Sequence, residues 1–114
     1  MRRHGLAQST EAEREMMLYY VTHAYDGKQE TYDKVKQIVF DFQNDDWENC
    51  YVSPILTFPY IGTKDESGEL INFVPIRLDL LTVCDVLLVA SKPDAAINME
   101  VEFAKSVGME ICYV

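Results

Sequence analysis

One apolar run near the end of the chain constrains the fold more than any other feature. Residues 85–90 read Asp-Val-Leu-Leu-Val-Ala, with one charge at the start and no polar alternation. A strand of this kind is typical of a parallel sheet covered on both faces, because neither side of the strand meets water. Parallel strands need long crossover connections, which are usually helices, so the run predicts helices on both sides of it in the sequence.

The rest of the chain supplies the strands and helices that such a sheet needs. Strand-like segments lie at residues 16–22, 50–53 and 110–114. Three further segments show apolar residues with helical spacing. The first segment starts at Glu30, the second contains Ile76, Leu80 and Val83 and ends near Cys84, and the third covers residues 97–108. Residues 54–73 hold two prolines and two glycines, and they are predicted to form a long irregular loop of the kind that serves as a lid or binding loop.

This alternation predicts an α/β fold: a small, doubly wound, flavodoxin- or Rossmann-like parallel sheet of about four strands, with helices on both faces. With the common strand order 2-1-3-4, the crossovers change direction between the first and third strands. Ligands bind at such a switch point, beyond the carboxyl ends of the strands. The loops expected there are residues 23–27 and 91–96, with Glu100 one turn into the following helix.

Glu100 is predicted to point into the protein. In a helix over residues 97–108, Ile97, Val101 and Ala104 share one face, and Glu100 lies on that same face. Burial of an unpaired charge is costly, so an inward carboxylate suggests a function. The structural alternative, a salt-bridged or half-exposed acid near a helix start, has about even odds before the neighbouring residues are considered.

Size, charge and composition limit the possible functions. The 114 residues fit a tail or short helix over 1–15 and a single domain over 16–114. The net charge of −9 argues against a nucleic-acid partner, because that binding depends on Lys and Arg. No secretory signal or membrane span is expected, and the three unpaired cysteines fit reduced thiols in the cytoplasm. Neither a dinucleotide or phosphate-loop motif nor a zinc-ligand spacing is present, so no cofactor or metal is predicted.

Several segments resemble the nucleoside 2-deoxyribosyltransferase-like superfamily, including its small bacterial and phage branch. The densest match is Asp-Ala-Ala-Ile-Asn-Met-Glu at residues 94–100, supported by residues 20–25, 53–54 and 83–85. The resemblance implies that Glu100 is the nucleophilic carboxylate and that Asp94 holds a sugar hydroxyl. An ionised carboxylate only accepts hydrogen bonds, so Asp94 would fix which hydroxyl protons point toward it.

The chain also departs from the family pattern. His23 stands where the family usually has glycine or another small residue, and Ala96 stands where it has glycine. Each of these larger side chains would narrow the sugar pocket. Arg77 stands where active transferases have the carboxylate that works on the base. Asp79 lies two residues further on, about 200° around a helix, so it does not inherit that role by position.

The first functional hypothesis is cleavage of a nucleoside or nucleotide N-glycosidic bond with retention, in which Glu100 forms a covalent deoxyribosyl-enzyme. Such an enzyme would be a nucleoside 2-deoxyribosyltransferase or a deoxynucleoside 5′-monophosphate N-hydrolase. The further substrate-binding candidates are Tyr20, His23, Tyr25, Phe58, Arg77 and Asp79.

Each of these candidates has a structural alternative. The aromatic residues would stack on the base, although such residues more often fill cores. His23 would donate to the leaving base, or it would be a satisfied structural group. Arg77 would bind a 5′-phosphate, or it would pair with a surface acid. Asp94 would hold the sugar, or it would cap its helix.

The second functional hypothesis is a non-catalytic nucleoside- or nucleotide-binding module that has lost the acid acting on the base. Under both hypotheses the partner is a small molecule. The sheet edges and the long aromatic loop also predict a homo-oligomer, as a dimer or a larger assembly.

Overall fold

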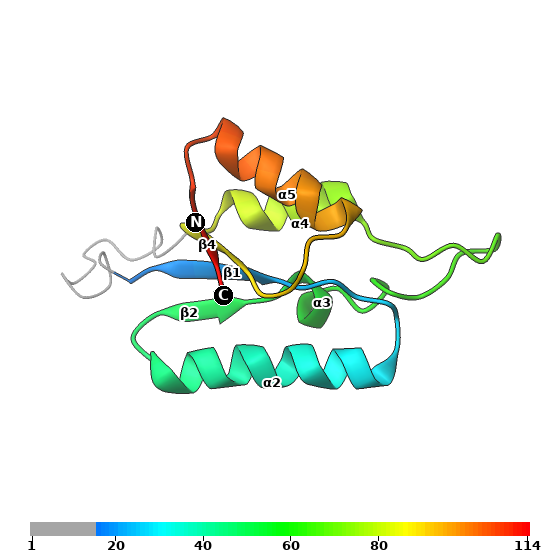
Figure 1. The fold of residues 1–114 in the computed structure, drawn as a ribbon, viewed down its shortest axis with the longest axis horizontal. Helices are drawn as coiled ribbons and strands as arrows, with labels where there is room; N and C mark the ends of the chain where they lie inside the picture. The colour runs from blue at the N-terminus through cyan, green and yellow to red at the C-terminus, as the bar shows by residue number, and fades with distance from the viewer. Residues whose placement is uncertain (1–15) are drawn as a thin grey trace, which may run out of the picture.

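The computed structural model describes residues 16–114, and the predicted tail or short helix over residues 1–15 lies outside the described residues. Four parallel strands form one sheet in the order β2-β1-β3-β4, as predicted (Figure 1). Their bounds are β1 Leu18–Thr22, β2 Cys50–Val52, β3 Val86–Val89 and β4 Glu110–Tyr113. All four residues of β3 are buried, which confirms the strand covered on both faces.

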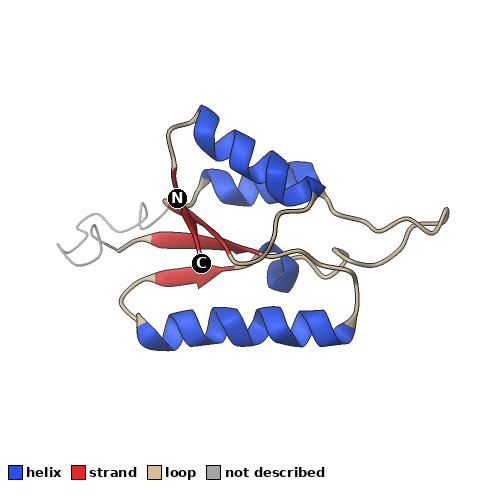
Figure 2. Ribbon diagram, viewed as in Figure 1, coloured by secondary structure: helices blue, strands red, loops and turns tan. Residues whose placement is uncertain are grey.

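Helices cover both faces of the sheet, so the predicted small doubly wound α/β fold is confirmed (Figure 2). On one face lie α2 (Gln29–Asp45) and the short α3 (Pro54–Thr57), and on the other lie α4 (Val74–Thr82) and α5 (Ala95–Ser106). Each pair packs on its own buried cluster of side chains. The two clusters meet across the sheet, and together they form the core.

Strand alternation decides which face each β1 side chain reaches. Tyr20 belongs to the cluster under α4 and α5, whereas its neighbour Val21 belongs to the cluster under α2 and α3. Successive strand residues point to opposite faces, so Thr22 lies on the same side as Tyr20. The end of β1 therefore presents two hydroxyl-bearing residues to α4 and α5.

Stacked rings distinguish the opposite face. The rings of Tyr19 and Tyr51 lie 4.8 Å apart and those of Phe42 and Tyr51 5.5 Å apart, both pairs nearly parallel. We call Tyr19, Tyr51 and Phe42 the aromatic stack. The Tyr51 hydroxyl donates to Asp46 at 2.7 Å, beside the end of α2. The stack therefore joins β1, β2 and α2 at the amino-terminal edge of the sheet.

Two details of the predicted elements are wrong. Residues 54–73 are not irregular throughout, because they begin with α3, for which Ser53 is the N-cap and Pro54 an early helical residue. In α4, the apolar spacing indicates the wrong buried face. Ile76 and Val83, which define that spacing, are each 43% exposed, whereas Arg77 and Leu81 are buried. An arginine occupies the inward face of α4 because the opposite helix supplies a carboxylate for it.

The long connection beyond α3 extends away from the body of the protein (Figure 1). Backbone hydrogen bonds from Gly62 to Ile71 and from Ile71 to Thr63 hold its two arms together, and Lys64 and Leu70 form an antiparallel bridge. The connection is thus a narrow hairpin. Whether it acts as a lid or binding loop stays a prediction.

All three cysteines, Cys50, Cys84 and Cys112, lie within the described residues, and all are free. Burial raises the pKa of the Cys84 thiol to about 12, with a smaller contribution from the charge of Asp85. No cluster of metal-ligating side chains occurs within residues 16–114. None of the helices in that range is long and apolar enough to cross a membrane.

Candidate functional site

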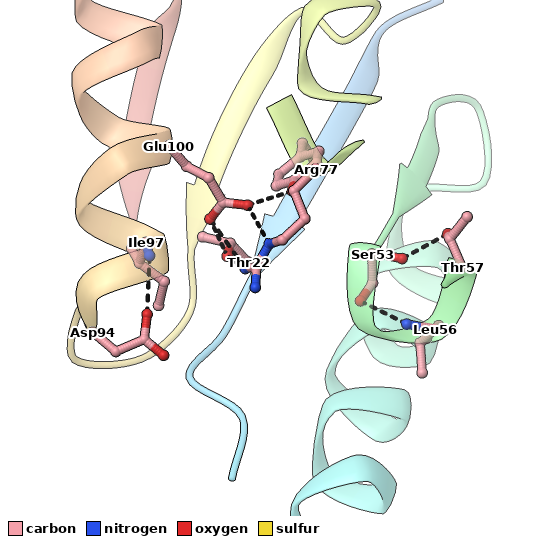
Figure 3. A network of polar contacts seen from close by, with 9 residues as sticks. Thr22, Ser53, Leu56, Thr57, Arg77, Asp94, Ile97 and Glu100 are labelled. Atoms are coloured by element: carbon pink, nitrogen blue, oxygen red, sulfur yellow. Dashed lines mark hydrogen bonds and ion pairs between the residues drawn. The ribbon is translucent and has the colours of Figure 1, made fainter. Parts of the chain in front are cut away.

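Glu100 lies inside the protein, as the sequence predicts. It occupies the second turn of α5, which begins after Asp94, and its side chain has no exposed surface. Figure 3 shows the carboxylate pointing from α5 toward Thr22 and Arg77. The inward direction of this acid is thus confirmed, while its role as a nucleophile stays a prediction.

Three side chains from two other elements donate hydrogen bonds to this carboxylate. Arg77 of α4 donates to Glu100 Oε2 from Nε at 2.9 Å and to Oε1 from Nη2 at 3.3 Å. Thr22 donates to Oε1 at 2.6 Å, and the Tyr20 hydroxyl donates to Oε2. Arg77 Nη2 also donates to the Thr22 hydroxyl oxygen at 3.1 Å. We call Tyr20, Thr22, Arg77 and Glu100 the Glu100 network.

The ion pair between Arg77 and Glu100 is enclosed, with side-chain exposures of 2% and 0%. Burial is the largest single effect on the pKa of Arg77 and lowers it, but the charge of Glu100, together with the hydrogen bond to Glu100 and the contribution of Tyr20, outweighs burial, so the net pKa is raised. Arg77 therefore remains a cation. The expectation that it pairs with a surface acid is wrong, because its partner is the buried carboxylate of α5.

The arrangement leaves Glu100 with no free acceptor position. An ionised carboxylate has about four lone-pair positions, and four hydrogen bonds occupy them here. A nucleophilic carboxylate also needs a path to the carbon that it attacks, and this one has no exposed surface. In this conformation the network is therefore a structural ion pair, and attack by Glu100 would require Arg77 or a hydroxyl to withdraw.

Tyr20 acts within this network, and its side chain lies in the core. It is fully buried, and its ring packs in the cluster under α4 and α5. Burial raises the pKa of Tyr20, and the negative charge of Glu100 raises it further, so the hydroxyl keeps its proton and remains a donor. The predicted stacking of Tyr20 on a base has no exposed ring face to use in this conformation.

Three other acids, the candidates Asp94 and Asp79 and the strand-opening Asp85, lie apart from the Glu100 network. Asp94 accepts a hydrogen bond from the backbone N–H of Ile97 at 2.9 Å, so it caps α5 (Figure 3). Asp85 accepts from the backbone N–H of Leu18 at 2.8 Å, which places it at the amino-terminal edge of the sheet. Asp79 is exposed on α4, two residues past the inward Arg77. The capping role of Asp94 is thus observed, whereas sugar binding by Asp94 stays a prediction.

The predicted loops do meet at the carboxyl ends of β1 and β3. The Ser91 hydroxyl oxygen accepts from the backbone N–H of Ala24 at 2.8 Å and lies 3.0 Å from the Lys92 carbonyl, to which it can donate. His23 is 7% exposed, and its Nδ1 lies 2.7 Å from the Ala24 carbonyl. This buried contact agrees with the structural interpretation of His23, and donation from His23 to a leaving base stays a prediction.

The remaining aromatic candidates lie on the other side of the sheet. Tyr25 and Phe58 pack, half-buried, against the cluster under α2 and α3. The Tyr25 ring lies 6.5 Å from that of Tyr32, and it packs so closely on Gly62 that a Cβ there would lie 2.2 Å from a ring carbon. The structure does not bring these two rings together with Glu100.

Sequence reasoning missed Thr22, which joins the network through its hydroxyl group. The pattern that identifies it is simple: Thr22 lies two residues after Tyr20 on the same strand and so faces the same helices. Its hydroxyl accepts from Arg77 and donates to Glu100, so it links cation and anion.

Comparisons with known proteins give no match, whether with family models, with curated proteins or with solved structures. The resemblance to the nucleoside 2-deoxyribosyltransferase-like superfamily therefore stays a prediction, based on the residues quoted for it above. The site has to be interpreted from its own geometry.

Proposed function

We propose that this protein is a non-catalytic binding module for a nucleoside or nucleotide, built on a deoxyribosyltransferase-like α/β fold. The observation that carries the proposal is the enclosure of Glu100, whose carboxylate is fully buried and hydrogen-bonded at every acceptor position. A residue held in this way stabilises the packing of α4 and α5 on β1. It does not present a free oxygen to a sugar.

The place proposed for the ligand is the switch point between β1 and β3. The crossover connections change direction between these two strands, and crevices at such points are the usual ligand sites of open α/β sheets. Residues 23–27 and 91–94 form the two loops, and the first turn of α5 follows. Among the polar atoms there, the contacts described above do not use His23 Nε2, the second acceptor position of the Ser91 hydroxyl or Asp94 Oδ2. A net charge of −9 favours an uncharged nucleoside over a multiply phosphorylated ligand.

The proposal includes the setting in which such a module would act. The ligand is a small molecule, the location is the cytoplasm, and the protein works as a homo-oligomer. Three free cysteines are compatible with a reducing compartment.

A binding and turnover assay with purified protein tests the proposal. Deoxynucleosides and their 5′-monophosphates are titrated by calorimetry and by amide NMR shifts, and free base is followed by chromatography in the same samples. We expect saturable binding, shifts centred on residues 23–27 and 91–96, and no base release. Absence of binding by every compound would overturn the module, and base release by the wild-type protein would overturn its non-catalytic character.

The Asp94→Gly variant tests whether Asp94 contacts the ligand. Glycine at an N-cap position destabilises a helix by only a few tenths of a kcal/mol, so α5 should remain folded while the carboxylate is lost. We expect at least a roughly tenfold loss of affinity, which is the size of one hydrogen bond to a charged group. Unchanged affinity would show that Asp94 only caps its helix.

A second candidate function is N-glycosidic bond cleavage by Glu100. The observation that favours it is that Arg77 holds a buried carboxylate one and a half turns into α5, next to the proposed ligand loops. Catalysis would require the ligand to displace Arg77 and open a path to the carboxylate. Base release by the wild-type protein, abolished in Glu100→Gln with the fold intact by circular dichroism, would support this candidate over the binding module.

A further inference from the structure

Two large aromatic side chains, one on α2 and one in the turn just after its end, remain exposed to water. Phe40 is 59% exposed on this helix, and Trp47, which follows the C-cap residue Asp46, is 79% exposed. In Figure 1, α2 forms an outermost layer, and no other element of the described chain lies on its outer side. Exposed aromatic side chains of this size are typical of protein interfaces, where tryptophan often contributes most of the binding energy.

A hollow lies on the first part of the same face. It has a volume of about 350 Å³ and is lined by Asp33, Lys36, Gln37 and Phe40. A ring placed there would contact the ring of Phe40 and the cationic end of Lys36, both of which attract an aromatic face. Trp47 of the same chain follows the end of α2 and does not line this hollow, whose middle lies roughly 13 Å along the helix axis from Asp45.

The charges of α2 and its flanking residues are divided along its length. Residues 28–36 contain three lysines and two acids, whereas residues 37–48 contain four acids and no basic residue. The first segment is therefore close to neutral, with an excess of one positive charge, and the second is strongly acidic. An antiparallel pair of identical helices would place the acidic segment of each beside the lysines of the other, whereas a parallel pair would place the two acidic segments side by side.

From these observations we propose that the protein forms a two-fold symmetric dimer through the outer faces of two antiparallel α2 helices. Trp47 of each copy occupies the hollow of the other, and Lys36 of each copy lies beside Glu48 of the other. The symmetry axis passes near residue 42, halfway between the hollow and Trp47. Such an isologous contact uses the same patch twice and closes on itself.

A second copy fits this face better than an unrelated partner. A basic partner would match only the acidic end of the helix, and it would leave the hollow beside Lys36 unused. The second copy supplies an aromatic ring for the hollow and an acid for the lysine from one short segment, residues 47–48. One helix pair makes a small interface, so we expect a dissociation constant in about the micromolar range.

The only tryptophan of the chain makes the test direct. Sedimentation velocity and tryptophan fluorescence are recorded together on the full chain over concentrations from about 0.1 μM to 1 mM, a range that extends below and above the expected dissociation constant. We expect the mass to double and, over the same range, the emission to shift to shorter wavelength with weaker acrylamide quenching. A monomer at all concentrations, or a dimer whose tryptophan stays fully quenchable, would overturn the proposal.

Charge reversals test the geometry of the dimer. Lys36→Glu and Glu48→Lys should each weaken the dimer by roughly tenfold, and the double variant should restore it, because the pair is then reversed in both places. Trp47→Ala should weaken it more than either reversal. The matched control is Lys105→Glu, at an exposed position of α5, which makes the same charge change away from α2 and should leave the mass unchanged. Failure of the double variant to recover association, with its fold intact by circular dichroism, would exclude the antiparallel arrangement.

Discussion

The two faces of the sheet use tyrosine in different ways. Under α4 and α5, Tyr20 is enclosed and donates to the ion-paired Glu100. Under α2, Tyr51 lies in the aromatic stack, and its hydroxyl reaches Asp46 in a partly exposed place. In both places a tyrosine hydroxyl donates to a carboxylate, but loss of the donor should destabilise the protein by different amounts. Water can replace the tyrosine beside Asp46, whereas it does not reach the enclosed Glu100.

Removal of the Glu100 carboxylate should have the largest effect and break the α4/α5 face first. Glu100→Ala leaves the Arg77 cation buried without its partner, and we expect a loss of about 3–5 kcal/mol in the free energy of unfolding, measured by urea denaturation. The matched substitution on the α2/α3 face is Ile55→Val, which should cost about 0.5–1.5 kcal/mol.

A double variant separates the ion pair from simple packing. Arg77→Met combined with Glu100→Leu removes both charges, so it should be more stable than Glu100→Ala, because apolar side chains of similar volume replace the pair. If Glu100→Ala were no more destabilising than Ile55→Val, the enclosure of the network would be refuted.

Matched tyrosine substitutions should sharpen the comparison with a smaller effect. Tyr20→Phe removes a buried donor to a charged acceptor and should cost about 1.5–3 kcal/mol. Tyr51→Phe removes the donor to Asp46 and should cost clearly less, because water reaches that carboxylate. Both free energies come from the same denaturation experiment. Equal losses would mean that exposure does not separate the two faces.

The smallest expected effect is the pH dependence of the Tyr51 contact. Hydrogen bonds from the Asn49 amide and then the Tyr51 hydroxyl lower the pKa of Asp46 from its ordinary value of 3.8. A lowered pKa in the folded state stabilises the protein above pH 3.8, and that contribution is lost as the pH falls through the folded pKa. The difference between wild type and Tyr51→Phe should therefore shrink in acid, as followed by denaturation at a series of pH values. A difference that stays constant through this range would contradict the contact.

The sequence predicts much of the frame because the frame depends on local patterns. The apolar run before Ser91 specifies a doubly covered strand, and helical spacing on either side specifies the crossovers. The observed strand order is the common one for such folds, and the local patterns alone do not specify it. The inward direction of Glu100 follows from its position relative to Ile97 and Val101 on one helix face.

The partner of Glu100 could not be predicted in the same way. Arg77 is 23 residues away on another helix, and its neighbours Ile76 and Leu80 suggest a different inward face. Only the packing of α4 beside α5 shows that Arg77 and Leu81 point inward. The physical clue was present, since a buried carboxylate needs a compensating cation, but the sequence offers ten lysines and arginines from which to choose.

The pairing of Arg77 with Glu100 also has an evolutionary consequence. A change of either residue alone leaves the other charge unpaired in the core, so we expect single substitutions at this site to be strongly destabilising. Lineages that exchange one member should be found to have exchanged the second as well.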